Sequence, residues 1–225
     1  MKTSIRLTLL SLAICYMSIA QAVTIDTIPV GNAGNAGEVQ SQGTFGGVYY
    51  NYRIGKTEVK NAQYTEFLNA VADSDPYGLY NSAMGEDTRG GITRSGAPSS
   101  YTYAVKPNAV GQGPGGSDYT YSDKPVVFVS WYDSIRFANW LHNGQGSGVT
   151  EEGAYTLLGG TPIPSNGLSI TRNSGASWFL PSENEWYKAA YHKNDGVTGN
   201  YWDYPTAIDT MPNNNTTSPI AKTDV

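Results

Sequence analysis

The stretch SWFLPSENEWYKAAYH, residues 177–192, holds the residues with the clearest capacity for chemistry. Glu183 and Glu185 lie two apart, and paired carboxylates serve as general acid and base in glycoside hydrolysis. Residues two apart on a helix point about 200° from each other, so these side chains do not face one substrate together. Ser182 and Glu185 also form a capping box, S-x-x-E, and acidic residues suit a first helical turn. We therefore interpret the pair as a helix start.

The remaining polar candidates have local explanations of the same kind. The only two histidines, His142 and His192, come at the ends of predicted helices, where a donor or cation satisfies terminal carbonyls. Neither has the spaced partners that a metal site requires. Ser130 and Ser182 stand in capping contexts, outside any G-x-S-x-G nucleophile motif. The sequence thus predicts no catalytic residue.

A long tyrosine-rich stretch is the best candidate for ligand binding. Residues 73–123 are rich in Gly, Ser, Tyr, Asn and Pro and show no sustained periodicity. Because a structureless stretch of this length is unusual inside a compact domain, we interpret it as a functional surface insertion packed by its tyrosines, rather than a linker between two domains. The candidate ligand-contacting residues are Tyr101, Tyr103, Tyr119, Tyr121 and, as the most exposed of the tryptophans, Trp202.

Three helices are expected to position these residues. Apolar residues at helical spacing predict a helix over residues 61–72, with Asn61 as its N-cap. Ser130 and Asp133 form a second capping box, S-x-x-D, which starts a helix that ends at Gly144. The third helix begins at Ser182 and ends near position 193.

Several short strands complete the expected architecture. Alternating or continuous apolar residues predict strands over residues 23–30, 48–54 and 126–129, with two further short strands within 154–160 and 167–172. Abundant tyrosine and glycine and few charged residues suit a loop-rich domain packed by aromatic side chains better than a helical bundle. About 200 residues suffice for one sizeable core.

The first residues resemble an export signal. Lys2 and Arg6 precede an apolar run over residues 7–20, and the run ends at Ala20-Gln21-Ala22, a small-x-small cleavage site. The apolar run is too short for a spanning helix, which needs roughly 20 apolar residues. We therefore expect residues 1–22 to be a signal peptide and residues 23–225 to form one exported domain, secreted or periplasmic and not membrane-embedded.

Composition excludes several classes of chemistry for residues 23–225. The only cysteine of the sequence, Cys15, lies in the leader, so the exported part has no disulfide, thiolate metal site or cysteine nucleophile. The formal net charge of −5 becomes about −7 when Lys2 and Arg6 leave with the leader. Basic residues are not clustered, which argues against a nucleic acid as partner.

Five blocks carry a family resemblance that spans nearly all of the exported part. They are YRIGKTEVKNAQYTEFLNAV (52–71), KPVVFVSWYDSIRFANWL (124–141), SWFLPSENEWYKAAY (177–191), GNYWDYPT (199–206) and SPIAKTDV (218–225). In this order and spacing they resemble the formylglycine-generating enzyme family, also called the sulfatase-modifying factor domain, in its exported bacterial members.

The resemblance implies a fold and an activity. The fold is a single α+β domain related to C-type lectins, and the founding activity is aerobic oxidation of a sulfatase cysteine to formylglycine by two copper-binding cysteines. Those cysteines belong to the family's C-terminal third, which this sequence does not reach, so we expect a fragment or an interrupted gene product. Copper is then expected only if a longer form supplies the cysteine pair. The resemblance also implies calcium, with Asn214 or Asn215 as ligand.

These observations leave three hypotheses for function. The first is an exported domain of the family that lacks oxidase activity, with no catalytic residue and no cofactor held by this chain. The alternative is a noncatalytic, lectin-like module that binds an envelope polymer or protein. The third is a fragment of an active oxidase. Coding DNA beyond codon 225 discriminates, because two nearby cysteines there would favour the oxidase.

Overall fold

The computed structural model describes residues 22–212, which form short helices and three separate pairs of antiparallel strands. The helices are α1 (Asn61–Val71), α2 (Ala83–Glu86), α3 (Trp131–His142) and α4 (Glu183–Tyr191), with 3-10 turns at Pro114–Gly116 and Gly167–Ser169. The strand pairs are β1 (Thr27–Val30) with β4 (Tyr52–Gly55), β2 (Glu38–Gln40) with β3 (Gly43–Phe45), and β5 (Ile92–Ser95) with β6 (Thr102–Val105). Few helices and short antiparallel strands agree with the predicted α+β class.

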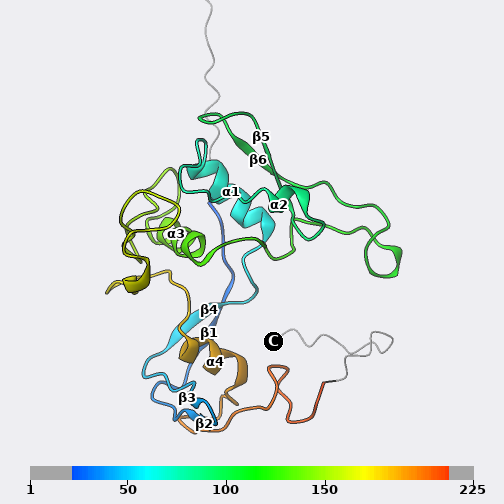
Figure 1. The fold of residues 1–225 in the computed structure, drawn as a ribbon. Helices are drawn as coiled ribbons and strands as arrows, with labels where there is room; N and C mark the ends of the chain where they lie inside the picture. The colour runs from blue at the N-terminus through cyan, green and yellow to red at the C-terminus, as the bar shows by residue number, and fades with distance from the viewer. Residues whose placement is uncertain (1–21, 213–225) are drawn as a thin grey trace, which may run out of the picture.

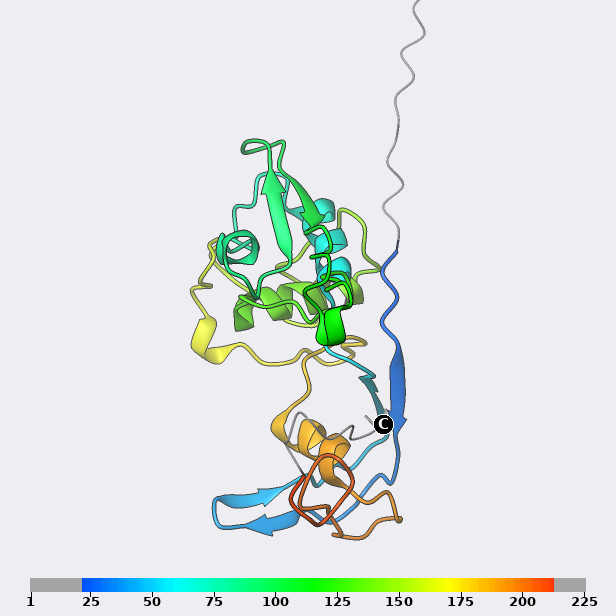
Figure 2. The same cartoon turned by 90° about the vertical axis from the view of Figure 1, so that its right-hand side faces the viewer.

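The elements gather into two lobes. α1, α2, α3, β5 and β6 form a larger lobe, while α4, β2 and β3 form a smaller one, and the β1–β4 pair runs between them (Figures 1 and 2). The chain also crosses between the lobes on its way from the end of α3 to α4 (Figure 1). The segments that connect the lobes therefore include β4 and the residues that precede α4.

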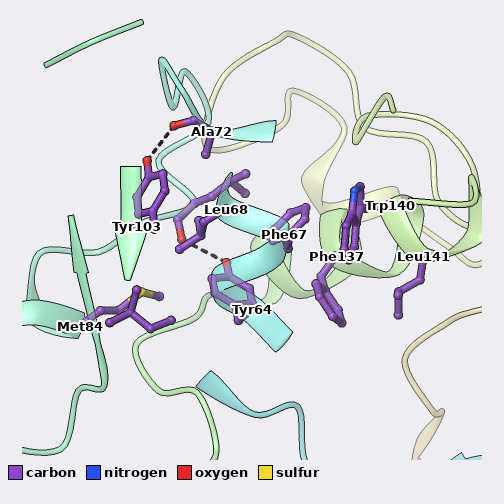
Figure 3. Close-up of a cluster of buried hydrophobic side chains, with 11 residues drawn as sticks. Tyr64, Phe67, Leu68, Ala72, Met84, Tyr103, Phe137, Trp140 and Leu141 are labelled. Atoms are coloured by element: carbon purple, nitrogen blue, oxygen red, sulfur yellow. Dashed lines mark hydrogen bonds between the residues drawn. The ribbon is translucent and has the colours of Figure 1, made fainter. Parts of the chain in front are cut away.

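The core of the larger lobe is aromatic. Phe67 of α1 lies 5.3 Å, centroid to centroid, from both Phe137 and Trp140 of α3 (Figure 3). Edge and tilted contacts of this kind add to the burial of apolar surface. The pairing of α1 with α3 explains why both helices show an apolar face at helical spacing.

The stretch 73–123 is not the surface insertion that the sequence predicted. It forms α2, β5 and β6, and it supplies four core residues that are at most 5% exposed: Leu79, Met84, Ile92 and Tyr103. The Tyr103 hydroxyl donates a 2.7 Å hydrogen bond to the main-chain oxygen of Ala72 (Figure 3). These core residues fall at irregular spacing across turns and short strands, so no period in the sequence revealed them.

The three predicted helices are confirmed, with one correction at the start of α1. Lys60, not Asn61, occupies the N-cap position. Asn61 is the first helical residue, and its side-chain nitrogen donates a 2.9 Å hydrogen bond to the main-chain oxygen of Tyr121. The cap is made instead by Gln63, whose side-chain oxygen accepts from the main-chain nitrogen of Lys60 at 2.8 Å. A contact made 60 residues away therefore outweighs the capping preference of asparagine.

The strand predictions were less accurate. The strands predicted over 23–30 and 48–54 are shorter, at Thr27–Val30 and Tyr52–Gly55. Residues 126–129 are not a strand, because Phe128 has a φ of +64°, which interrupts an extended backbone. The strands predicted within 154–160 and 167–172 are also wrong. The first stretch packs as a loop against Ile135, and the second contains a 3-10 turn.

No helix within residues 22–212 combines the length and the apolar character that crossing a bilayer demands.

Candidate functional site

Glu185 is the centre of a polar network that links α4 to the segments connecting the two lobes. It lies in the first turn of α4 and is 1% exposed. Its side-chain oxygen Oε2 accepts from the main-chain nitrogen of Ser182 at 2.6 Å, and its own main-chain nitrogen donates to Ser182 Oγ at 3.2 Å. The predicted capping box is therefore confirmed. Glu183, by contrast, is exposed to solvent on the same turn.

Two residues that the sequence analysis did not single out complete this network. The Tyr50 hydroxyl donates to Glu185 Oε1 at 2.6 Å, and Arg172 Nη1 donates to Oε1 and Oε2 at 2.9 and 3.2 Å. Arg172 Nη2 donates to the Tyr50 hydroxyl at 3.0 Å, so the three side chains form a closed triangle. Tyr52 adds a hydrogen bond from its hydroxyl to the main-chain oxygen of Glu185. These partners join β4 and the loop before α4 to the start of the helix.

The hydrogen bonds determine the charge state of the network. Burial alone would raise the pKa of Glu185, but the hydrogen bonds from Tyr50, Ser182 and Arg172 outweigh it and lower the pKa below the usual glutamate value. Burial and the hydrogen bond to Glu185 raise the pKa of Tyr50. Glu185 is therefore an ionised acceptor at neutral pH. It holds Tyr50 and Arg172 in place and has no proton to give to a substrate.

A cleft opens next to the network. We call it the β4 cleft: its walls are residues 50–55, which include β4, and residues 172–179, and its volume is about 680 Å³. A neighbouring, more apolar hollow of about 490 Å³ shares several of its residues, namely Ile54, Gly55, Trp178, Phe179 and Pro181. The network thus forms part of the wall of a cleft that is large enough for a ligand.

The lining of the β4 cleft is cationic and aromatic. Arg53 and Arg172 line it, and no aspartate or glutamate is among its lining residues. The Arg172 guanidinium lies 4.0 Å from the centroid of the Phe179 ring. Arg53 is anchored to Thr27, with Nε to Oγ1 at 2.8 Å and Nη2 to the main-chain oxygen at 2.6 Å. Because Glu185 already neutralises Arg172, Arg53 is the cationic lining residue that no carboxylate of residues 22–212 pairs with, and it is the group suited to an anion.

The aromatic residues predicted to contact a ligand do not form one site. Tyr103 is buried in the core, and the Tyr101 ring lies 4.3 Å from the Arg94 guanidinium. Tyr119 and Tyr121 pair edge to face at 5.0 Å. Trp202 is half-buried, with the Lys193 ammonium 4.3 Å from its ring, so it is not the most exposed tryptophan as predicted; Trp186 is 52% exposed. None of the predicted aromatic residues lines the β4 cleft, and Asn214 and Asn215 lie outside the described residues.

The two histidines do not satisfy helix carbonyls as predicted. His142 Nδ1 accepts from the main-chain nitrogen of Ser177 at 3.1 Å and lies 2.8 Å from Ser177 Oγ. His192 Nε2 donates to the oxygen of Thr198, a loop residue, at 3.1 Å. Each ring therefore ties a helix end to a following loop. Over residues 22–212, no three His, Cys, Asp or Glu side chains meet in a metal-binding arrangement.

The serine–histidine contact beside the cleft lacks the third member of a nucleophilic site. Ser177 lines the β4 cleft, and its contact with His142 has the distance of a nucleophile–base pair. However, no carboxylate contacts the His142 ring in the part of the chain that the structure describes. Within residues 22–212 the pair therefore lacks a carboxylate that would orient the histidine as a base.

Comparison with known proteins identifies the family. Neither a search of curated proteins nor a search of solved structures returned a match. One family model matches, described as a sulfatase-modifying factor enzyme 1-like domain, and it covers residues 28–221. Because this match spans most of the chain, the protein belongs to the sulfatase-modifying factor family.

Proposed function

We propose that residues 23–225 form an exported binding domain of the sulfatase-modifying factor family that does not oxidise cysteine. The observation that carries the proposal is the absence of any cysteine after Cys15 in this sequence. The oxidation implied by the family resemblance uses a copper ion held by two thiolates. Residues 23–225 do not fit that ion, because they contain no thiolate, and the thioethers of Met84 and Met211 cannot exchange with a substrate thiol.

The β4 cleft supports a binding role. Its polar groups are already fixed by the Tyr50–Arg172–Glu185 triangle, so the wall is preorganised. The pKa of Glu185 is lowered and that of Tyr50 is raised, so neither group changes its protonation state near neutral pH, as a general acid or base would need to do. An anchored, charged and aromatic wall is the arrangement of a ligand site.

The location of binding differs from our expectation from the sequence. The lectin-like hypothesis assigned recognition to the tyrosines of residues 73–123. Because Tyr103 is a core residue and none of these tyrosines lines the β4 cleft, we propose the β4 cleft as the ligand site instead. Export through a cleaved signal peptide remains part of the proposal, and it rests on the pattern of residues 1–22.

A single assay tests the proposal. The purified protein, supplied with Cu(I) and oxygen, is incubated with a cysteine peptide that carries a sulfatase modification motif, and mass spectrometry monitors conversion of the cysteine to formylglycine. We expect no conversion above the level of copper without protein. Turnover by the protein would overturn the proposal. A longer form of the protein with two added cysteines, if the coding DNA supplies one, is the matched positive control.

A further inference from the structure

The residue that follows the predicted cleavage site is held at both of its main-chain polar groups. Val23 donates its main-chain N–H to Gln145 Oε1 at 2.6 Å, and Gln145 Nε2 donates to the main-chain oxygen of Val23 at 2.8 Å. The Val23 side chain packs against the core of the larger lobe, while Ala22, just before it, is exposed. One amide side chain, 122 residues away in the sequence, therefore holds the chain directly after the predicted cut.

Gln145 has a strained main-chain conformation. It lies just after α3 with a φ of +69°, in the left-handed region that residues other than glycine rarely occupy. Its main-chain nitrogen donates to the main-chain oxygen of Trp140 at 2.9 Å, which ends the helix, and a glycine would take this position without strain. Within residues 22–212, the hydrogen bonds of its side chain are the two with Val23. Strained positions of this kind cluster at binding sites, so the strain directs attention to the amide and its contact.

The next two residues are held as well. Gln63 Nε2, from α1, donates to the main-chain oxygen of Thr24 at 2.8 Å, and Ile25 packs against the same core as Val23. Figure 2 shows this segment, in dark blue, alongside the larger lobe before it enters β1. A protease acts where the main chain is free of hydrogen bonds and packing. The bond between Ala22 and Val23 is therefore poorly accessible once this segment is in place.

We infer that the Gln145 amide is the binding site for the amino end that cleavage after Ala22 creates. The inference rests on the export in the proposed function and adds the site that receives the processed chain. Two independent observations meet at one bond: the small-x-small pattern predicts the cut between Ala22 and Val23, and the contacts with Gln145 lie directly after it.

Cleavage changes the chemistry of the group that Gln145 binds. Hydrolysis of the bond by one water leaves a carboxylate on Ala22 and an α-ammonium on Val23 at neutral pH. The ammonium is a charged donor to Gln145 Oε1, and hydrogen bonds from charged donors are stronger than those from a peptide N–H. Maturation is then sequential: the protease cuts while the segment is free, and binding of the new amino end protects Val23 from further trimming.

Intact-mass measurement of the exported, purified protein tests the inference. We expect the chain to begin at Val23. In the presence of a nonspecific aminopeptidase, Gln145→Gly should lose Val23 at least about tenfold faster than wild type, because trimming follows the population of the unbound amino end. Glycine suits a positive φ, so this variant keeps the turn after α3 and folds. Gln112→Gly, at an exposed glutamine between β6 and α3, is the matched control and should be trimmed as slowly as wild type.

A second variant separates the amino end from an ordinary peptide N–H. Gln145→Glu offers a carboxylate to the α-ammonium, so it should be trimmed more slowly than Gln145→Gly. Equal trimming of wild type and Gln145→Gly, or equal trimming of the two Gln145 variants, would overturn the inference and leave the proposed function standing. A purified protein that still carries its leader would instead overturn the export in the proposed function, and the inference with it.

Discussion

α3 and α4 begin with the same local motif, yet the acidic residues that complete the two capping boxes meet different surroundings. Asp133 and Glu185 are both buried, and each accepts from the main-chain nitrogen of its capping serine. Burial raises the pKa of Asp133, whereas the hydrogen bonds at Glu185 outweigh burial and lower its pKa. The motif determines where a helix starts, and distant partners determine the direction in which the pKa of its acidic residue shifts.

The difference lies in the nearest arginine. Arg136 Nη1 stays 3.9 Å from Asp133, because its Nε donates to Glu151 at 2.6 Å. Arg172 donates directly to both side-chain oxygens of Glu185. Asp133 therefore acts within its own helix, while Glu185 ties α4 to the segments that connect the lobes and orders one wall of the β4 cleft.

The largest expected effect is the loss of the Glu185 side chain. Glu185→Ala removes the acidic half of the capping box and leaves Arg172 without its carboxylate, so we expect a loss of about 3 kcal/mol in the free energy of unfolding. Asp133→Ala should cost only about 1 kcal/mol, because Arg136 keeps Glu151. Urea denaturation measures both. Glu183→Ala, at an exposed position, is the control and should change stability by less than about 0.5 kcal/mol. Equal losses at Asp133 and Glu185 would contradict the comparison.

The pH dependence of stability should differ in sign between the two acids. Glu185 has a lowered folded pKa, so its contribution is present above the unfolded pKa and is lost as the pH falls through the folded pKa. Asp133 has a raised folded pKa, so its contribution is present below the unfolded pKa and is lost as the pH rises through the folded value. Unfolding free energies of wild type, Glu185→Gln and Asp133→Asn between about pH 3 and about pH 6 provide the check.

The expected outcome is a pair of opposite trends. As the pH falls, wild type should lose its stability advantage over Glu185→Gln. Over the same range, wild type should gain stability relative to Asp133→Asn, because protonation removes the cost of burying the Asp133 charge. If the free energy of unfolding of wild type relative to each variant changed with pH in the same direction for both acids, the contrast between Asp133 and Glu185 would be wrong.

Tyr50→Phe should have a smaller effect. The change removes the 2.6 Å hydrogen bond to Glu185, but Tyr50 is 44% exposed and Arg172 still pairs with the carboxylate. We expect a loss of about 1 kcal/mol by thermal denaturation. Tyr49→Phe, at a neighbouring residue that is 88% exposed, is the matched control and should have no measurable effect. A larger loss at Tyr49 would contradict the proposed network.

The sequence was informative wherever structure depends on neighbours along the chain. Both capping boxes and all three long helices were predicted, because capping and apolar periodicity act over a few residues. The Tyr50–Glu185 contact joins residues 135 apart, and no local pattern records it. The run at residues 126–129 failed for a related reason: its apolar residues suited a strand, but the φ of +64° at Phe128 depends on packing. Tyr103 appeared to be a surface residue because the core of the larger lobe is assembled from irregularly spaced segments.

The two serines should show the smallest difference. Ser130→Ala and Ser182→Ala each remove an oxygen that accepts from the main-chain nitrogen three residues later, at 3.1 and 3.2 Å. Loss of an N-cap serine costs about 1 kcal/mol, so we expect similar losses that differ by less than about 0.5 kcal/mol in urea denaturation. Equal losses would show that the serine of each capping box contributes through its local hydrogen bond alone. A clearly larger loss of unfolding free energy for Ser182→Ala would mean that the contacts of Glu185 with Tyr50 and Arg172 depend on the cap. The start of α4 and the pKa of Glu185 would then not be set independently.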